Sequence, residues 1–157
     1  MSSLPELKEL IITKGHSEDL KRIFPLYEED FPANERKSSQ RLEELLDAGS
    51  YHLLLLQQKI RGEFLGYALV YQAEEVLWLD YLAIAESSRG LGYGSYFFQQ
   101  IPLFWEKSIG MFLEIEIPTS QNPIVRRQQE KRISFYEGLG AQKLGFPYLF
   151  PTEKGGF

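Results

Sequence analysis

The segment best suited to chemistry is a glycine-rich loop, Arg89-Gly-Leu-Gly-Tyr-Gly94, which follows an apolar, strand-like run and leads into an expected helix. The free N–H groups at a helix N-terminus point outward and carry a partial positive charge. Glycines let a phosphate approach that backbone closely. The loop could therefore bind a polyphosphate even in a chain whose formal net charge is −5.

Three interpretations compete for this loop. A flexible turn that only starts a helix is disfavoured, because three glycines alternate after a strand of buried composition. A dinucleotide fingerprint, Gly-x-Gly-x-x-Gly, fits Gly90 and Gly92 but requires a third glycine where Ser95 stands. The third is the pattern Arg-x-x-Gly-x-Gly, which Arg89, Gly92 and Gly94 fit throughout.

The composition is that of an ordinary globular chain. Its 157 residues fit one domain, residues 1–157, and 43% of them are hydrophobic. There is no cysteine and the two histidines, His16 and His52, lie far apart, so we expect neither a disulfide nor a metal site. The negative net charge argues against nucleic acid as a partner. No signal-like apolar N-terminus and no apolar run of about 18 residues occurs, so we expect a cytoplasmic protein without a membrane partner.

The helices are predicted from hydrophobic spacing and from their start and stop residues. Pro25 and Pro32 bracket an acidic, aromatic segment that we expect to join the first two helices, and Gly49 closes the second. Pro102 should kink the third helix or end it near Gln100. The expected helix starts are Ser17 as N-cap, Ser38 or Ser39, about Tyr93, and Asn122–Pro123.

The strands complete a mixed α/β fold. Short polar turns separate the middle three, which indicates an antiparallel meander, and a β-α-β unit follows. The element order is β-α-α-β-β-β-α-β-α-β, which predicts a mixed, mostly antiparallel central sheet flanked by helices. The expected strands are Leu10–Thr13, Tyr51–Gln57, Glu63–Tyr71, Val76–Ile84, Met111–Ile117 and one within Ala141–Phe150.

The Arg-x-x-Gly-x-Gly loop and its surroundings resemble the GNAT family of N-acetyltransferases. Leu79-Asp-Tyr-Leu-Ala-Ile84 looks like that family's fourth strand, and Leu113-Glu-Ile-Glu116 looks like its fifth. Arg132-Ile-Ser-Phe-Tyr-Glu-Gly-Leu-Gly140 looks like its fourth helix. The resemblance implies an acyl-CoA N-acyltransferase-like fold, acetyl-CoA as cosubstrate, no metal, and transfer of an acetyl group to a primary amine of a small molecule or peptide.

By this resemblance the loop and the strand end before it bind acetyl-CoA. The helix start would hold the pyrophosphate, and a backbone N–H of the strand would stabilise the oxyanion of the tetrahedral intermediate. The residues implied are Leu82, Ala83, Ile84, Arg89, Gly90, Leu91, Gly92, Tyr93, Gly94 and Ser95.

The resemblance also implies catalytic side chains. Tyr136 matches the family tyrosine that hydrogen-bonds the departing thiolate, and the alternative is a core aromatic. A carboxylate is needed to deprotonate the amine, whose pKa is about 10.4. The family's glutamate position holds Trp78 here, so the base is sought nearby, in the order Glu116, Asp80 and Glu114.

The acceptor site is expected to involve the segment between the first two helices, which in the family often lines the substrate cleft. Carboxylates interleaved with aromatics suit a cationic amine. A solvated acidic turn is the alternative. The residues assigned to acceptor binding are Tyr27, Asp30, Phe31 and Glu114.

Two alternative functions remain, and the C-terminal segment allows two interpretations. A non-catalytic acyl-CoA-binding or regulatory module on the same fold is one alternative, because of Trp78, and a nucleotide-binding protein is the other. The family has one further strand after Ala141–Phe150, for which Pro151–Phe157 is poorly suited. Either the fold lacks its last strand or the sequence is part of a longer protein. An unpaired strand edge can pair with another chain, so we expect a weak homodimer.

Overall fold

The computed structural model describes residues 9–145. The chain forms two compact units, a first unit of residues 1–112 and a second unit of residues 113–157. The first unit begins with β1 (Leu10–Lys14), α1 (Ser17–Asp30), α2 (Ser39–Asp47), β2 (Tyr51–Gln58), β3 (Phe64–Ala73) and β4 (Val76–Ile84). It continues with the short 3₁₀ helix η2 (Glu86–Ser88), α3 (Tyr93–Gln100), the 3₁₀ helix η3 (Ile101–Phe104) and β5 (Gly110–Leu113), whose last residue already belongs to the second unit.

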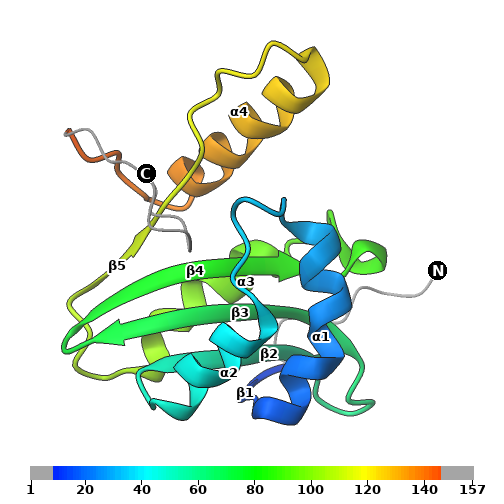
Figure 1. Ribbon diagram of the computed structural model, residues 1–157, viewed down its shortest axis with the longest axis vertical. Helices are drawn as coiled ribbons and strands as arrows, with labels where there is room; N and C mark the ends of the chain where they lie inside the picture. The colour runs from blue at the N-terminus through cyan, green and yellow to red at the C-terminus, as the bar shows by residue number, and fades with distance from the viewer. Residues whose placement is uncertain (1–8, 146–157) are drawn as a thin grey trace. The chain divides into compact units, whose positions relative to one another are not determined.

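The sheet is mixed and five-stranded, with the strands in the order β1-β2-β3-β4-β5 (Figure 1). The first three neighbouring pairs are antiparallel, as short connections between consecutive strands require. β5 lies beside the start of β4, where Ile109 N–H donates to the carbonyl of Glu75 at 2.8 Å and the rings of Trp78 and Phe112 are 6.1 Å apart.

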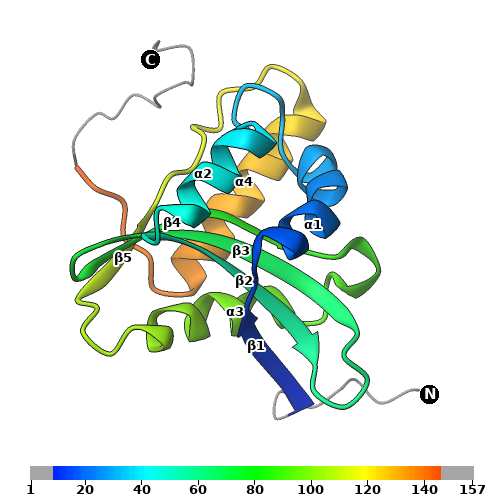
Figure 2. The ribbon, with the colours of Figure 1, turned by 60° about the horizontal axis from the view of Figure 1, so that its bottom comes forward.

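Helices cover both faces of this sheet, with α1 and α2 on one face and α3 on the other (Figure 2). Alternating side chains of a strand point to opposite faces, so β2, which is apolar at consecutive positions, must be buried on both. The core under α1 and α2 comprises Leu20, Ile23, Tyr27, Leu42, Tyr51, Leu53, Leu55, Tyr67, Leu69 and Tyr81. The α3 side buries Tyr93, Phe97 and Ile101, with Leu54, Leu56, Ala68, Val70 and Leu79 of the strands.

A β-bulge interrupts the pairing of β3 with β4. Leu69 pairs with Tyr81 and Val70 pairs with Leu79, so Asp80 is an extra residue without a partner position on β3. A bulge re-aims the side chains around it. As a result Asp80 and Tyr81 both make contacts on the face that α1 and α2 cover.

The second unit contains one described helix, α4 (Pro123–Gly138). The Asn122 side chain accepts hydrogen bonds from the N–H groups of Ile124 and Val125, and proline occupies the first helical position, as the sequence predicts. Residues 114–117 before it are not in a strand. Among the described residues no helix is long and apolar enough to cross a membrane.

Most element predictions are confirmed, and three need correction. His16, not Ser17, is the N-cap of α1, because the Asp19 carboxylate accepts from its N–H at 2.8 Å. α1 continues through Pro25 to Asp30. The expected strand Met111–Ile117 ends at Leu113. Residues 141–145 form no strand, and the rest of the segment expected as the final strand lies outside the described residues.

The continuation of α1 past Pro25 has an energetic reason. A proline inside a helix costs about 3 kcal/mol, whereas burying a large apolar side chain contributes about 1.5–3 kcal/mol. Leu20, Ile23 and Tyr27 lie on one side of α1 and are almost completely buried against the sheet. Their combined burial exceeds the cost of the proline, so the helix continues across it.

Tyr27 joins this core to the α1–α2 segment, residues 31–38. Its hydroxyl accepts from the N–H of Lys37 at 2.6 Å and donates to the carbonyl of Lys37 at 3.1 Å, and burial raises its pKa to about 12. We predict that Tyr27→Phe lowers the free energy of unfolding by about 1–3 kcal/mol, because it leaves partly buried backbone groups without partners. Urea denaturation measures this. The control Tyr71→Phe removes a hydroxyl from a ring that is 41% exposed, and equal losses in both variants would contradict the prediction.

Candidate active site

The glycine loop has the backbone that an anion site at a helix start requires. Gly90 and Gly92 have φ angles of +77° and +84°, a region that favours glycine. Gly92 is the N-cap of α3, and the first hydrogen bond of the helix joins Tyr96 N–H to its carbonyl at 3.2 Å. The N–H groups of Tyr93, Gly94 and Ser95 precede that bond and have no carbonyl within the helix to reach. Since the Tyr93 side chain is buried, only its backbone can meet a ligand.

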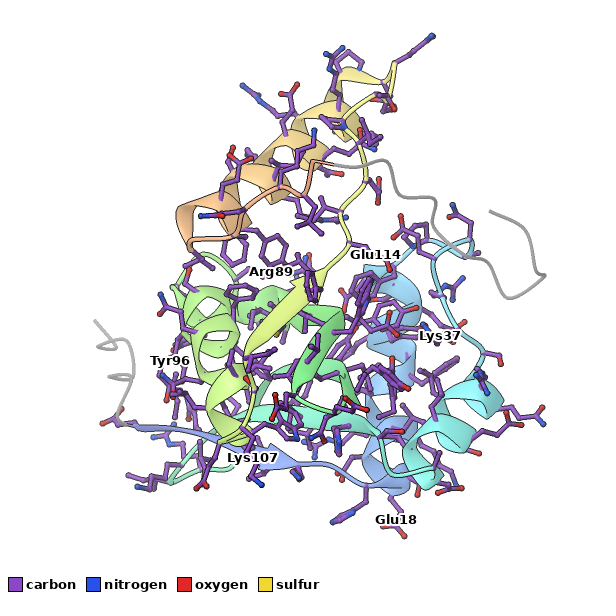
Figure 3. The ribbon with its side chains drawn as sticks, turned by 90° about the vertical axis from the view of Figure 1, so that its left-hand side faces the viewer. Glu18, Lys37, Arg89, Tyr96, Lys107 and Glu114 are labelled. Carbon is purple, nitrogen blue, oxygen red and sulfur yellow. The ribbon has the colours of Figure 1, made fainter. Side chains whose placement is uncertain are left out.

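Arg89 shapes the entry to this loop. Its Nε donates to the carbonyl of Ile84 at 2.9 Å, and its Nη2 donates to Oδ1 of Asp30 at 2.9 Å. The Tyr67 hydroxyl donates to the other oxygen of Asp30 at 2.8 Å. Arg89 therefore ties the loop to the end of β4 and to α1, while its side chain stays 53% exposed and can still meet an anion (Figure 3).

A small cavity lies next to this ion pair. Its lining includes Leu26, Asp30, Phe64, Tyr67 and Arg89, and its volume is about 50 Å³. That space holds a few water molecules and is too small for an acceptor molecule. Asp30, which the sequence analysis assigned to acceptor binding, has Arg89 and Tyr67 as partners here, and its role toward an acceptor stays a prediction.

The end of β4 presents backbone donors on the edge that faces away from β3. Ala85 N–H donates to the carbonyl of Leu65 at 2.8 Å, which shows which N–H groups at the end of β4 point toward β3. In an antiparallel pair, N–H groups point to the partner strand at every second residue. The N–H of Ala83 therefore points to β3, and the N–H groups of Leu82 and Ile84 point to the opposite edge. Either could serve as an oxyanion donor.

Asp80, at the β4 bulge, is the best-defined carboxylate near this edge. Its Oδ2 accepts from the Tyr51 hydroxyl at 2.5 Å and from Lys37 Nζ at 2.6 Å. The Lys37 ammonium also lies 5.3 Å from the centroid of the Tyr81 ring, a cation–π distance. Burial, reinforced by the negative charge of Asp80, raises the pKa of Tyr51 well above its ordinary value, so this hydroxyl remains a donor.

The α1–α2 segment is held over Asp80 by aromatic residues. The Tyr81 hydroxyl donates to the carbonyl of Glu35 at 2.5 Å, and Phe31 packs edge-on against the Tyr81 ring with centroids 4.8 Å apart. Tyr27, predicted to touch the acceptor, lies in α1 rather than in a loop, and its ring is fully buried. Phe31 is half-buried and packs on the same Tyr81 ring.

The second unit carries the other predicted catalytic residues. Glu116 accepts from Gln129 Nε2 at 2.8 Å and from Arg132 Nη1 at 3.3 Å, so α4 fixes its carboxylate. Tyr136 is half-buried on the same helix, and burial raises its pKa, partly offset by the charge of Arg132. Glu114 directly follows β5.

The two side chains that bind Asp80 were not predicted from the sequence. Lys37 and Tyr51 lie 43 and 29 positions from Asp80 along the chain, and no local spacing connects them. The available signal was Asp80 itself, because a carboxylate in an apolar strand requires buried partners. Among the described residues, no group of three or more possible metal ligands is found.

Comparison with known proteins decides the family. A sequence profile of the acetyltransferase (GNAT) family matches residues 20–101, more than half of the chain, from α1 through α3. The chain belongs to the GNAT acetyltransferase family. A search of curated proteins gave no match.

Solved structures of GNAT acetyltransferases share the fold. A GNAT-family protein of Bacteroides thetaiotaomicron has a TM-score of 0.66 and 21% identity, over 82% of this chain and 69% of that one. The ribosomal-protein-alanine N-acetyltransferase of Brucella melitensis has a TM-score of 0.63 and 18% identity, over 90% of this chain and 97% of that one. The spermidine N-acetyltransferase of Vibrio cholerae has a TM-score of 0.64 and 14% identity, over 88% of this chain and 82% of that one. At these identities the likeness concerns the fold.

The proposed phosphate site at the N-terminus of α3 can be tested by a substitution whose side chain blocks the approach of a phosphate. We predict that CoA raises the melting temperature, and that Gly94→Val weakens CoA binding by about tenfold or more. Gly94 lies in the first helical turn without a positive φ, so the substitution tests close approach rather than backbone strain. Gly92→Val should also abolish the shift, although its φ of +84° adds strain.

Gly138→Val is the matched control, because Gly138 ends α4, has no positive φ and has open space around its Cβ position. Thermal shift and isothermal titration with CoA, NAD and ATP measure the effect. Unchanged CoA affinity in a folded Gly94→Val protein, or a shift with NAD or ATP and none with CoA, would refute the assignment of the loop.

Proposed function

We propose that this protein transfers the acetyl group of acetyl-CoA to a primary amine of a small molecule or peptide. The observation that carries the proposal is the α3 N-terminus, where Gly92 in a left-handed conformation caps a helix whose first N–H groups have no helical acceptor. Membership of an acetyltransferase family supports the reaction class. An acidic chain with few basic side chains at this loop would bind a pyrophosphate chiefly through backbone N–H groups.

The reaction forms a bond between the amine nitrogen and the thioester carbon and breaks the C–S bond, and the amine loses a proton. The N–H of Leu82 or Ile84 would donate to the carbonyl oxygen as it becomes negative. Preorganised donors of this kind stabilise a transition state because they cost no reorganisation when the charge forms. The pairing of β4 with β3 holds both groups in place.

We assign to Asp80 the role of the general base that accepts the proton of the amine. Asp80 belongs to the same unit as the glycine loop, two positions before Leu82 on β4, and Lys37 and Tyr51 hold its carboxylate by hydrogen bonds. Glu116 is the alternative base, and its carboxylate is engaged by Gln129 and Arg132 of α4.

Tyr136 would stabilise the leaving thiolate. Burial favours the neutral phenol and raises its pKa, so the hydroxyl is protonated at neutral pH and can donate. The same shift makes full proton transfer less favourable, since a thiol has a pKa of about 8.5. Tyr136 is therefore expected to hydrogen-bond the thiolate rather than fully protonate it.

The class of acceptor follows from the surroundings of Asp80. A carboxylate beside the rings of Phe31 and Tyr81 suits a cationic amine. Structural neighbours include an aminoglycoside acetyltransferase, a spermidine N-acetyltransferase and a ribosomal-protein-alanine N-acetyltransferase.

The proposal is tested by an amine screen. The protein is incubated with acetyl-CoA and separately with a polyamine, an aminosugar and peptides with a free N-terminus or lysine, while free thiol and acetylated product are measured. Product with at least one amine class is expected. Binding of acetyl-CoA without turnover of any amine would instead indicate a non-catalytic acyl-CoA-binding module.

The tyrosine assignment is tested with Tyr136→Phe. We predict that kcat falls by about a hundredfold while CoA affinity stays nearly unchanged, because the hydroxyl acts only on the leaving group. The neighbouring Phe135→Leu, which alters the same ring pair, is the packing control. An unchanged kcat in Tyr136→Phe, or an equal loss in both variants, would show that Tyr136 only packs.

A further inference from the structure

The Asp80 carboxylate is engaged asymmetrically. Both of its hydrogen-bond donors, the Tyr51 hydroxyl and the Lys37 ammonium, bind the same oxygen, Oδ2. Among residues 9–145 no further hydrogen bond or ion pair to Asp80 is found, which leaves Oδ1 available to a ligand. The carboxylate is only 14% exposed, so little water competes for that oxygen.

Lys37 reaches Asp80 from a backbone that is itself fixed. Tyr27 bonds both the N–H and the carbonyl of Lys37, and Tyr81 bonds the carbonyl of Glu35 two residues earlier. The donor to Asp80 is therefore set by the same tyrosines that hold the α1–α2 segment to the sheet. Figure 3 shows Lys37 extending from this segment.

We propose that Lys37 and Tyr51 are positioning residues, which hold Asp80 by Oδ2 so that Oδ1 faces the acceptor amine. This inference rests on the proposed acetyl transfer with Asp80 as base. A carboxylate held by two donors cannot rotate to share its charge among other partners, so a single oxygen is oriented toward the reacting nitrogen. The ammonium of Lys37 also provides the opposite charge that a little-exposed carboxylate requires.

The charged and titratable groups around Asp80 are few. Lys37 comes from the α1–α2 segment, Tyr51 from β2, and Tyr81 and Tyr27 are the neighbouring phenols. Burial raises the pKa of all three tyrosines further above their ordinary value, so the phenols are neutral at neutral pH. Arg36 also lies near enough to act on Tyr27, but Lys37 is the cation that contacts Asp80. Removal of Lys37 thus isolates the effect of that charge.

The test compares Lys37→Met with Lys37→Arg. Lys37→Met keeps the length of the side chain without its charge. We expect kcat to fall about tenfold or more with KM for acetyl-CoA unchanged, and the acidic limb of the kcat/KM profile to move to higher pH. Lys37→Arg should restore part of kcat and return the limb. Tyr51→Phe should lower kcat less, because it removes a donor and no charge.

Arg41→Met is the matched control, since Arg41 forms an exposed ion pair with Glu44 at 3.6 Å on the neighbouring helix α2. It should leave kcat and the pH profile unchanged. A second readout, independent of turnover, is the titration of the Asp80 carboxyl followed by carbon-13 NMR. Its midpoint should rise in Lys37→Met and not in Arg41→Met.

Wild-type kcat in Lys37→Met, or an unchanged NMR midpoint, would overturn the inference while the acetyl-transfer proposal stands. A loss of kcat that Lys37→Arg does not relieve, with the pH limb unmoved, would also overturn it and would show a purely structural role. If the wild-type protein itself acetylates no amine, the proposed function fails, and this inference fails with it.

Discussion

The cost of partly burying a carboxylate in an apolar strand determines much of the first unit. Asp80 enters the α1–α2 side of the sheet at a β-bulge, and a buried charge is tolerated only when it is paired and hydrogen-bonded. Lys37 and Tyr51 meet that requirement. Because Lys37 lies between two helices, its ion pair fixes the α1–α2 segment next to β4, whose N–H groups at Leu82 and Ile84 are the proposed oxyanion donors.

A second ion pair connects the glycine loop to the same helix and strand. Arg89 binds Asp30 at the end of α1 and the carbonyl of Ile84 at the end of β4. The first unit therefore has two charge links from α1 and its following segment to β4, one before and one after the N–H groups of Leu82 and Ile84. Each is only partly exposed on its carboxylate side, where screening by water is weaker than at a free surface.

Local signals in the sequence predict the elements that depend on local physics. Val76–Ile84 has the predicted bounds, Pro102 ends α3 at Gln100, and Asn122 caps α4. The features that the sequence did not predict depend on tertiary contacts. Pro25 lies inside a helix because the buried face of α1 compensates for it, and the Lys37–Asp80 pair joins residues 43 positions apart. The bulge that re-aims Asp80 follows from strand pairing rather than from its own residues. The single-domain prediction and the catalytic roles of individual residues stay predictions.

The central claim is that backbone N–H groups at the start of α3 bind the pyrophosphate of acetyl-CoA. A crystal structure of the protein with CoA tests it most directly. We expect pyrophosphate oxygens at about 3 Å from the N–H groups of Tyr93, Gly94 or Ser95, and the pantetheine arm along the edge of β4 that carries the N–H groups of Leu82 and Ile84. A pyrophosphate bound by side chains elsewhere, with the α3 start unoccupied, would contradict it.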